Sequence, residues 1–406
     1  MLASRDIVLL MVSLVLATIP VGYLLVVLPL YFNRAGLEPA LIGFLYSISG
    51  LVTAILVAFS GALADRFGRR VFLLGGTALP ILSYAVFAAT TEPGWLIVAS
   101  VVGGVGLANG AAGALTAASF DALLAEHTPP PKRTSVFAWA QAVWALALGL
   151  GSFAAGLPDL IRSRLVGLGE LDAYRPPFVL IIVLAVIATV ALLPIGERGV
   201  AADASRGSAG RTGWFPRRSL RVIARYAFAI GLFGLGLGIA VQLLPLWFKL
   251  RFGTDEAVLG PWYAVAQILS LSSVVLSPWL DRRLGSGLSI MLVHIGGALA
   301  LLAMAVVAPV FEIAAVAFVF RNALANLGWP LQQALLMGRV VPDERATAAG
   351  VGFAVWGLAN AIGPSIAGIL IQNGSLELPL ILGAVAYAAG GLAFGLGFRR
   401  RVVAWS

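Results

Sequence analysis

The stretch Gly61-Ala62-Leu63-Ala64-Asp65-Arg66-Phe67-Gly68-Arg69-Arg70 decides the fold, because it is a short charged segment between two long apolar runs. About 20 residues on either side of it carry no charge, and a bilayer core about 30 Å thick requires about 20 apolar residues per helical span. The segment therefore predicts a tight turn at a membrane surface that joins two transmembrane helices. Arginines also gather in any short cytoplasmic loop, so its charges alone could be a signal of topology.

The composition indicates a polytopic membrane protein. The chain of 406 residues is 60% hydrophobic and 11% charged, whereas soluble proteins carry about 25% charged residues. The net charge of +9 does not indicate a nucleic-acid partner, because the arginines lie in loops between apolar runs and not on one solvated face. With no cysteine, disulfides, thiol catalysis and cysteine metal sites are excluded. We expect no metal and no cofactor.

Twelve continuous apolar runs predict helices and not the alternating strands of a barrel. They cover roughly 6–32, 40–62, 71–90, 95–124, 134–157, 178–195, 221–250, 258–280, 287–309, 312–338, 345–372 and 377–398. The predicted fold is an all-α membrane protein of 12 transmembrane helices in two parallel-related six-helix bundles. Their expected bounds are 1–195 and 221–406, joined by a cytoplasmic linker at 196–220.

The distribution of cations predicts the orientation. Loops on the side of the amino terminus hold most of the arginines, and the acids divide more evenly between the two sides. By the positive-inside rule, we expect both termini in the cytoplasm and the chain in the cytoplasmic (inner) membrane. The cytoplasmic cations are Arg5, Arg66, Arg69, Arg70, Lys132, Arg133, Arg282, Arg283, Arg339, Arg345, those at 399–401 and those of the linker.

The two halves of the chain repeat each other. Leu28-Pro29-Leu30-Tyr31-Phe32 is echoed by Leu244-Pro245-Leu246-Trp247-Phe248, and Asp65-Arg66 is echoed by Asp281-Arg282 at the same offset along the chain. Arg133, Gly151 and Gly156 are matched by Arg345, Gly363 and Gly368, and these three pairs share a second, slightly shorter offset. Several matches in register indicate a duplicated six-helix unit, an arrangement associated with two bundles that rock about a central site.

The motif Gly61-x-Leu63-x-Asp65-Arg66-x-Gly68-Arg69-Arg70 resembles the signature between helices 2 and 3 of the major facilitator superfamily. The resemblance covers the whole chain when the duplication is included. It implies two bundles in a lipid bilayer and alternating-access transport of a small-molecule substrate. We expect a monomer.

Each part of the motif has a physical role. The Asp65 carboxylate can cap a helix N-terminus, where unpaired N–H groups favour an anion; by resemblance this is helix 11. Gly61 would allow close helix approach and Gly68 a tight turn. Arg69 requires an anion, which by resemblance is Asp121; otherwise Asp121 is an interfacial acid without a partner.

The second copy of the motif is degenerate. Ser277 stands at the position of the first glycine, and the last glycine is displaced by one residue, to Gly285. We expect Asp281 and Arg282 to latch more weakly against helix 5. The predicted gating residues are Gly61, Leu63, Asp65, Arg66, Gly68, Arg69, Arg70, Asp121, Asp281 and Arg282.

Few ionisable or polar residues lie inside the predicted spans. Arg321 is the one basic residue at depth, where a charge costs roughly 2.5–3.5 kcal/mol and should face a cavity or a partner. Asn322 and Asn326 follow it on one side of the helix. We expect Arg321 and Asn322 to contact the substrate at an anionic group; the alternative is that Arg321 is a structural anchor. His294 is expected to be peripheral.

Seven further polar or aromatic residues lie within the spans as weaker substrate candidates. Each could equally make a hydrogen bond between helices. They are Gln242, beside the predicted bend at Pro245, together with Tyr23, Asn109, Gln141, Gln267, Trp356 and Asn360.

The function predicted is secondary transport, with export of a small amphipathic or anionic solute, and protons as the candidate coupling ion. Helix 5 lacks the Gly-Pro-x-x-Gly-Gly pattern of drug–proton antiporters, and no carboxylate lies in the middle of a span, so Asp121 or an acid at an outer helix end would have to carry the proton. Uptake by a symporter or a uniporter is the alternative. A receptor without flux stays open, whereas an enzyme is not expected, because no catalytic motif is present.

Overall fold

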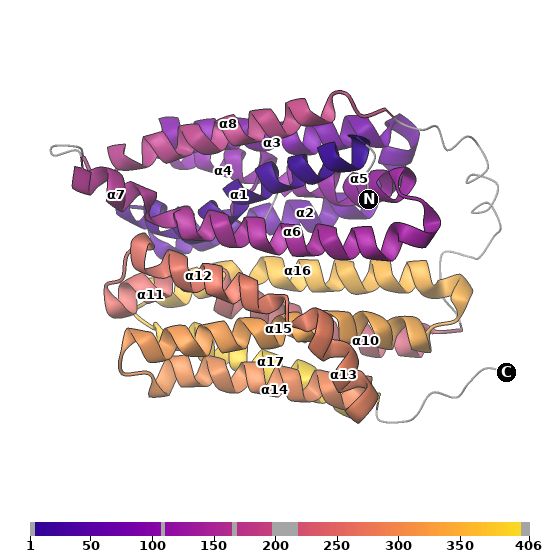
Figure 1. The fold of residues 1–406 in the computed structure, drawn as a ribbon. Helices are drawn as coiled ribbons and strands as arrows, with labels where there is room; N and C mark the ends of the chain where they lie inside the picture. The colour runs from indigo at the N-terminus through magenta and orange to yellow at the C-terminus, as the bar shows by residue number, and fades with distance from the viewer. Residues whose placement is uncertain (1–4, 107–109, 165–168, 197–217, 399–406) are drawn as a thin grey trace.

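The computed structural model describes residues 5–106, 110–164, 169–196 and 218–398, without the side chains at positions 62, 65, 117, 118, 274 and 275. The described chain is all helical and forms two bundles that lie side by side (Figure 1). Within these residues, ten helical segments are long and apolar enough to cross a membrane. The structure therefore supports the all-α membrane class, and the count of 12 spans stays a prediction.

The first bundle contains the helices up to residue 192. They are α1 (Arg5–Arg34), α2 (Pro39–Phe67), α3 (Arg69–Ala89), α4 (Pro93–Val102), α5 (Gly110–His127), α6 (Arg133–Phe153), α7 (Leu157–Arg164) and α8 (Arg175–Leu192), with short 3-10 turns that include Ala154–Gly156 and Asp172–Tyr174.

The second bundle contains the described helices from residue 220 onward. Its helices are α10 (Leu220–Val241), α11 (Leu244–Phe252), α12 (Glu256–Ser270), α13 (Ser273–Leu284), α14 (Ser286–Leu302), α15 (Phe311–Arg339), α16 (Arg345–Gln372) and α17 (Glu377–Gly397). The bend predicted at Pro245 separates α10 from α11. It follows from the missing N–H of proline, which leaves the carbonyl four residues earlier without its helical partner.

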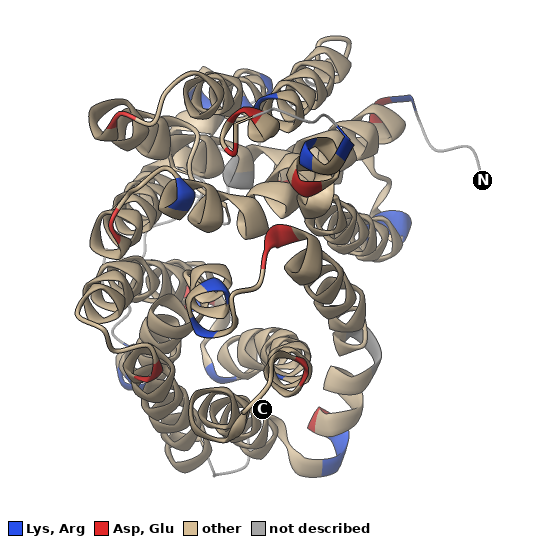
Figure 2. Ribbon diagram, turned by 90° about the vertical axis from the view of Figure 1, so that its left-hand side faces the viewer, with Lys and Arg blue, Asp and Glu red and all other residues tan. Residues whose placement is uncertain are grey.

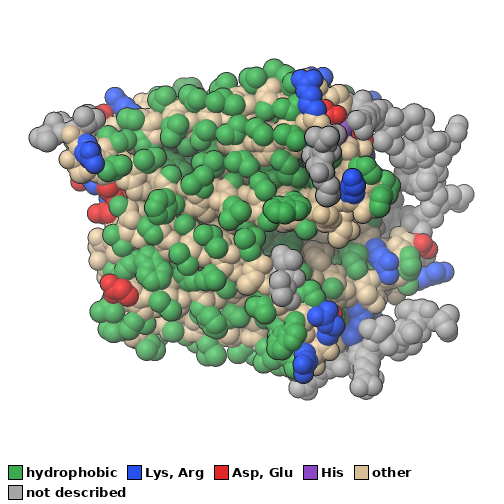
Figure 3. Space-filling view, viewed as in Figure 1, with side chains coloured by type: hydrophobic (Ala, Val, Ile, Leu, Met, Phe, Trp, Pro, Cys, Tyr) green, Lys and Arg blue, Asp and Glu red, His purple; other side chains and the backbone are tan. Residues whose placement is uncertain are grey.

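The molecule has two ends, which we name by the loops that they carry. The distal end holds the turns at Gly36, Gly253 and Gly374, and the proximal end holds the turns at Gly68 and Gly285 and the start of α1. The distal end lies at the left of Figure 1 and faces the viewer in Figure 2. Figure 3 shows charged side chains at both ends and a broad belt of hydrophobic side chains between them, as expected for a chain that spans a bilayer.

Two predicted spans are interrupted. The run at 95–124 forms α4 and α5, where Gly104, Gly106 and Gly110 have φ values of +90°, +56° and +54° that interrupt a helix. The run at 258–280 forms α12 and α13, which are separated after Ser270. These interruptions account for the difference between the ten spanning segments and the 12 apolar runs.

The duplication is visible in matching helix crossings. α1 crosses α6 at Gly22 and Gly151, and α10 crosses α16 at Gly238 and Gly363. A methyl group on any of these four glycines would collide with the backbone of the facing helix. Gly22 and Gly238 are as far apart in the sequence as Asp65 and Asp281 are. Gly151 and Gly363 are as far apart as Arg133 and Arg345 are. The two crossings therefore use corresponding positions of the repeat.

A second matching contact involves the arginines of the repeat. The Arg133 Nε donates to the carbonyl of Thr128 over 3.3 Å, and the Arg345 Nε donates to the carbonyl of Val340 over 3.4 Å. Each arginine begins a long helix, α6 or α16, and holds the end of the loop before it. The same bond at the same register shows that the two halves share local structure as well as sequence.

Candidate functional site

The charged motif forms the turn between α2 and α3. Gly68 has a φ of +102°, and its N–H donates to the carbonyl of Ala64 over 2.9 Å. In the second copy Gly285 has a φ of +77°, and its N–H donates to the carbonyl of Asp281 over 2.8 Å. The displaced glycine therefore ends its helix in the same way as Gly68. Only glycine adopts such a backbone conformation readily.

The side chains of the motif make local contacts. The Arg66 guanidinium lies 5.5 Å from the centre of the Phe67 ring, and Arg70 donates to the carbonyl of Leu193 at the end of α8. Leu63 is exposed on α2. The side chain of Asp65 lies outside the described residues, so its capping of the eleventh predicted span, which forms α16, stays a prediction.

Gly61, Arg69 and Asp121 complete the first copy. No described heavy atom lies within 4 Å of a Cβ built on Gly61, so the helix approach predicted there is not made in this conformation. Asp121 is exposed on α5. Its pairing with Arg69 stays a prediction.

The second copy lines a polar pocket at the proximal end of the second bundle. Asp281 accepts a hydrogen bond from the Ser286 hydroxyl over 2.6 Å, at the first turn of α14, and Arg282 is exposed. The pocket measures about 800 Å³ and also includes Arg283 and Arg339. The Asp281 bond thus lies within the second bundle.

The two bundles meet closely in their distal halves. A Cβ on Gly43 of α2 would collide with the carbonyl of Pro364 of α16, and a Cβ on Gly368 would collide with the carbonyl of Pro39. By contrast, no described heavy atom lies within 4 Å of a Cβ built on Gly350, in the proximal part of α16. Like Gly61, this position has room around it.

Polar groups also join the bundles at the distal end. The Gln372 amide donates to the Glu38 carboxylate over 2.9 Å and accepts from the Ala40 N–H over 3.1 Å. On the other side of the interface, Arg34 at the end of α1 contacts Asp255 and Glu256 at the start of α12. Asp255 and Glu256 come directly before the apolar run predicted at 258–280, so the sequence alone shows them only as acids at an outer helix end.

Arg321 lies inside the second bundle. Its guanidinium donates to the Tyr387 hydroxyl of α17 and stacks over that ring at 5.0 Å, and the side chain is fully buried. The Nε atom has no hydrogen-bond partner in the described part of the chain, and no described carboxylate pairs with the guanidinium. The depth expected for Arg321 is therefore observed, and its charge has only an uncharged hydroxyl as a described partner.

His294 lies beside Arg321, and the expectation that it is peripheral is wrong. It is 2% exposed, its Nδ1 lies 2.7 Å from the Ile290 carbonyl, and its Nε2 lies 3.0 Å from the Gln332 amide nitrogen. The Nδ1–H tautomer satisfies both contacts, because the carbonyl accepts and the amide donates. α14 thus turns a polar face into the bundle at this depth.

Asn322 and Asn326 bond to backbone. The Asn322 amide donates to the Ala266 carbonyl of α12 over 3.1 Å, and the Asn326 amide donates to the Asn322 carbonyl over 2.9 Å. The first of these bonds connects α15 to α12 close to the point where α12 ends, and the second lies within α15. Both side chains are half-buried, so a role in substrate contact stays a prediction.

Gln242 and Asn360 form a pair at the bend between α10 and α11. The Gln242 amide donates to the Asn360 side-chain oxygen over 3.1 Å, and the Asn360 amide donates to the Gly234 carbonyl over 3.3 Å. Trp356, one turn before Asn360 on α16, packs edge-to-face against Trp329, with the ring centres 5.5 Å apart. Its indole N–H is buried and has no partner among the described residues.

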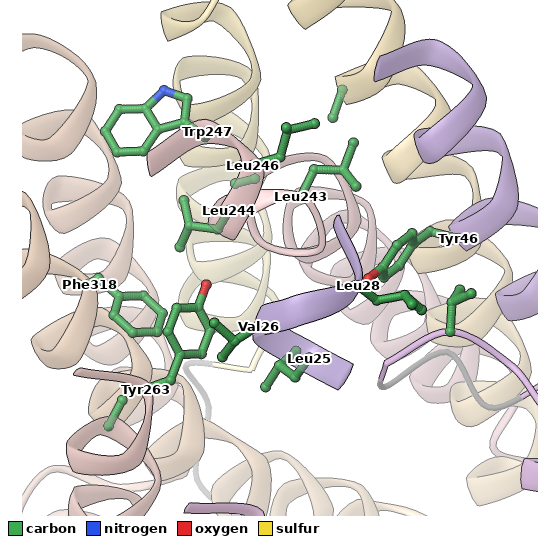
Figure 4. Close-up of a cluster of buried hydrophobic side chains, with 14 of the residues drawn as sticks. Leu25, Val26, Leu28, Tyr46, Leu243, Leu244, Leu246, Trp247, Tyr263 and Phe318 are labelled. Atoms are coloured by element: carbon green, nitrogen blue, oxygen red, sulfur yellow. The ribbon is translucent and has the colours of Figure 1, made fainter. Parts of the chain in front are cut away.

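Buried tyrosine hydroxyls without described partners lie near the interface of the bundles. Figure 4 shows Leu25, Val26 and Leu28 of α1 between Tyr46 on one side and Tyr263 on the other. The hydroxyls of Tyr46 and Tyr263 are buried and have no hydrogen-bond partner among the described residues. A buried donor without a partner costs about 1–3 kcal/mol, which favours a role for these groups in binding a solute or water.

The remaining candidates are spread over several helices. Tyr23 is buried on α1 beside Phe178, and its hydroxyl has no partner among the described residues. Gln267 of α12 is nearly buried and faces Gly149 of α6, across the bundle interface. Gln141 of α6 is exposed, and Asn109 lies outside the described residues. No group of three potential metal ligands occurs in the described part of the chain.

Comparison with known proteins assigns the family. The family model of the Major Facilitator Superfamily matches residues 10–322. The chain is 24% identical over 300 residues to the class H tetracycline resistance protein of Pasteurella multocida, which covers 71% of this chain and 70% of that protein. It is 25% identical over 392 residues to the multidrug efflux protein YfmO of Bacillus subtilis, covering 94% of this chain and 90% of YfmO.

Solved structures share the fold. The nucleoside transporter NupG superimposes with a TM-score of 0.73 at 15% identity, covering 98% of this chain and 100% of NupG. A D-xylose–proton symporter superimposes with a TM-score of 0.74 at 15% identity and 97% coverage of both chains. The chain belongs to the Major Facilitator Superfamily. It is a multi-pass membrane transporter and not an enzyme.

Proposed function

We propose that the chain exports a small amphipathic or anionic solute across the cytoplasmic membrane by alternating access, with protons as the coupling ion. The observation that supports alternating access is the uneven bundle interface. Gly43 and Gly368 are tightly packed in the distal half, whereas Gly61 and Gly350 have room around them in the proximal half. This asymmetry favours a conformation closed at the distal end and accessible from the proximal end.

The orientation follows from the arginines. Arg66, Arg69, Arg70, Arg282 and Arg283 all lie at the proximal end, and cytoplasmic loops carry the excess of cations. In this orientation the conformation faces the cytoplasm, the state in which an exporter takes up its solute. The efflux proteins among the relatives favour export.

The topology proposed has twelve spans. α4 with α5 and α12 with α13 would each cross the bilayer as one interrupted span, which adds two to the ten uninterrupted segments. The start of the first interruption lies against α1 and α2, because a Cβ on Gly106 would lie 3.6 Å from Leu25 and from Tyr46, as backbone irregularities at membrane depth require. The bundles would then end at about residue 195 and resume at about residue 221, with the linker between them in the cytoplasm.

An anionic solute is favoured by Arg321. A buried guanidinium without an acid partner is unfavourable in the membrane, and an anionic group of the solute would supply the missing charge. The Tyr263 ring packs against the Phe318 ring, one turn from Arg321, with the ring centres 4.5 Å apart. Tyr263 belongs to α12, a helix that contacts the first bundle. In this conformation the guanidinium is covered, so contact with a solute requires the side chains around Arg321 to rearrange.

Flux in proteoliposomes tests the function. A thermal-shift screen of anions, sugars, drugs and lipids first identifies a ligand, and uptake into vesicles with an imposed pH gradient then measures transport. We expect the ligand to move in the direction opposite to the proton flow that the pH gradient drives. Transport without any pH change on ligand addition would remove the antiport claim, and binding without flux would indicate a receptor.

Arg321→Ala tests the solute class. We expect it to abolish binding of anionic ligands while cationic ligands are affected less, because the guanidinium charge is lost. Arg283→Ala, at an exposed site beside Trp279, is the matched control and should leave both ligand classes unchanged. An equal loss for anions and cations with Arg321→Ala would indicate a structural arginine.

A further inference from the structure

The polar pocket at the proximal end of the second bundle lies where α13 ends and α14 begins. Its walls also include the end of α15 and the end of α17. Its volume of about 800 Å³ is many times the roughly 30 Å³ that one water molecule occupies in the liquid, so it can admit a group larger than a single ion. The buried Arg321 does not line this pocket, so the solute site proposed above leaves it unused.

Positive charge predominates in the pocket. Its described lining includes three arginines and a single carboxylate: Arg282, Arg283, Arg339 and Asp281. The Asp281 carboxylate already accepts the Ser286 hydroxyl over 2.6 Å. Arg282 is exposed and makes no hydrogen bond or ion pair with a described residue. Three guanidinium groups against one carboxylate leave positive charge in excess, so the pocket favours an anion.

The first bundle shows what fills the corresponding place when the charged motif is complete. The second residue after the turn glycine is Arg70 in the first copy and Gly287 in the second. Arg70 donates to the Leu193 carbonyl, directly after α8, the last described helix of its bundle. Gly287 likewise lies at the end of the last helix of its bundle, because a Cβ there would be 3.2 Å from the Phe398 carbonyl oxygen. The second bundle therefore lacks the arginine side chain that occupies this place in the first.

Two of the arginines contact aromatic rings at the rim of the pocket. The Arg283 guanidinium lies 5.8 Å from the centre of the Trp279 ring, and Trp279 is exposed. Exposed tryptophans of membrane proteins gather at the depth of the lipid headgroups, so the pocket opens at that depth. The Arg339 Nη2 donates to the Phe398 carbonyl over 3.1 Å. A guanidinium has five N–H donors, so Arg339 can bind an anion as well.

An apolar face of α14 leads away from the pocket. Leu284 and Leu288 are exposed and line the pocket, and the exposed Leu292 and Leu299 follow on α14. Leu288, Leu292 and Leu299 lie on one face of the helix by their spacing. Figure 3 shows basic side chains next to hydrophobic ones over α13 and α14, at the lower right. An acyl chain can lie along this face, whereas a free phosphate would leave it unused.

We propose that this pocket binds an anionic phospholipid, with the phosphate at Arg282 and Arg339 and an acyl chain along the leucines of α14. The phosphate would connect the end of α13 to the end of α15. In the orientation proposed above the proximal end faces the cytoplasmic leaflet, whose surface is negatively charged by anionic lipids. The binding itself requires neither that orientation nor any particular solute.

Native mass spectrometry of the purified full chain tests the proposal, because it resolves each bound lipid. The probes are phosphatidylglycerol and phosphatidylcholine with the same oleoyl chains, which share the phosphate diester and differ in net charge. A basic residue near an anionic lipid contributes about 1 kcal/mol, a factor of about five in affinity. With two arginines at the phosphate, we expect phosphatidylglycerol to bind roughly 25-fold tighter than phosphatidylcholine.

Arg282→Gln and Arg339→Gln should each weaken phosphatidylglycerol binding by roughly fivefold and leave phosphatidylcholine binding unchanged. Arg339 also contacts Phe398, so the exposed Arg282 provides the variant that is expected to fold in either case. Arg225→Gln is the matched control, because it removes an exposed arginine near the start of α10, outside the pocket. It should keep the preference of the wild-type protein.

Inorganic phosphate and glycerol 3-phosphate distinguish a lipid from a soluble anion. At a concentration equal to that of the lipid, we expect neither to displace phosphatidylglycerol, because neither contacts the leucines of α14. Displacement would assign the pocket to a soluble phosphate and overturn the proposal. Equal affinity for the two lipids in the wild-type protein would exclude an anionic-lipid site. A preference that survives unchanged in Arg282→Gln would place the lipid elsewhere on the molecule.

Discussion

Gly43→Ala should open the distal end, because the α2–α16 interface leaves no room for a side chain at this position. A Cβ on Gly43 would lie 2.9 Å from the carbonyl carbon of Pro364 and 3.2 Å from the Cα of Gly368, in addition to a collision with the Pro364 oxygen. These are backbone atoms of a long helix, so they cannot rotate away as the end of a flexible side chain can. The two helices must separate locally.

The size of the effect follows from the cost of overpacking. An extra methyl group in a tightly packed interface costs about 1–3 kcal/mol. Only the state closed at the distal end bears this cost, because α2 and α16 separate there in the other state. The ratio of closed to open molecules should therefore fall by roughly 5-fold to 150-fold.

Because the chain has no cysteine, spin labels at Trp95→Cys on α4 and Ile313→Cys on α15, two exposed distal positions on opposite bundles, report this ratio by double electron–electron resonance. We expect Gly43→Ala to increase the long-distance population at a fixed pH. Gly94→Ala is the control, because Gly94 is exposed in the first turn of α4 and no described heavy atom lies within 4 Å of a Cβ built there. Unchanged distances in a folded Gly43→Ala protein would refute the argument that the distal ends separate during transport.

Two further predictions concern the motif and the buried arginine. Asp65→Asn should weaken the proximal latch of the other state and shift the population toward the conformation described above; unchanged distances between the proximal ends of α2 and α16 would contradict this. Tyr387→Phe should lower the free energy of unfolding by about 1.5–3 kcal/mol, because the Arg321 guanidinium loses its hydroxyl partner. Tyr226→Phe is the control, since Tyr226 is buried but makes no hydrogen bond to a described residue, and equal losses in both variants would show that the bond contributes nothing.

The sequence predicted features that depend on local chemistry. Continuous apolar runs predicted the helices, and Pro245 predicted the break between α10 and α11. The apolar run around Arg321 predicted that this residue lies at depth, and its side chain is buried. In each case the deciding interaction lies within a few turns, so one segment of sequence contains it.

The distal ion cluster could not be predicted in this way. Arg34 and Asp255 lie on different halves of the chain, and each looks like an ordinary loop charge in its own segment. Burial alone would raise the pKa of Asp255, but the charges of Arg34 and Lys249 hold it below the usual value. Glu256 differs from its neighbour Asp255 in being fully buried, because the packing of the two bundles covers it.

The repeat register gives one further relation between the predicted cavity residues. At the same offset that relates Arg133 to Arg345, Trp356 corresponds to Trp144, and Arg321 corresponds to Asn109. Duplicated helices place corresponding residues at the same depth of their bundles. The guanidinium therefore has a neutral amide as its counterpart in the first half, and an anion bound by Arg321 would find no second guanidinium at that position. The backbones of the two halves differ as well, because α15 is continuous where the corresponding run of the first half forms α4 and α5.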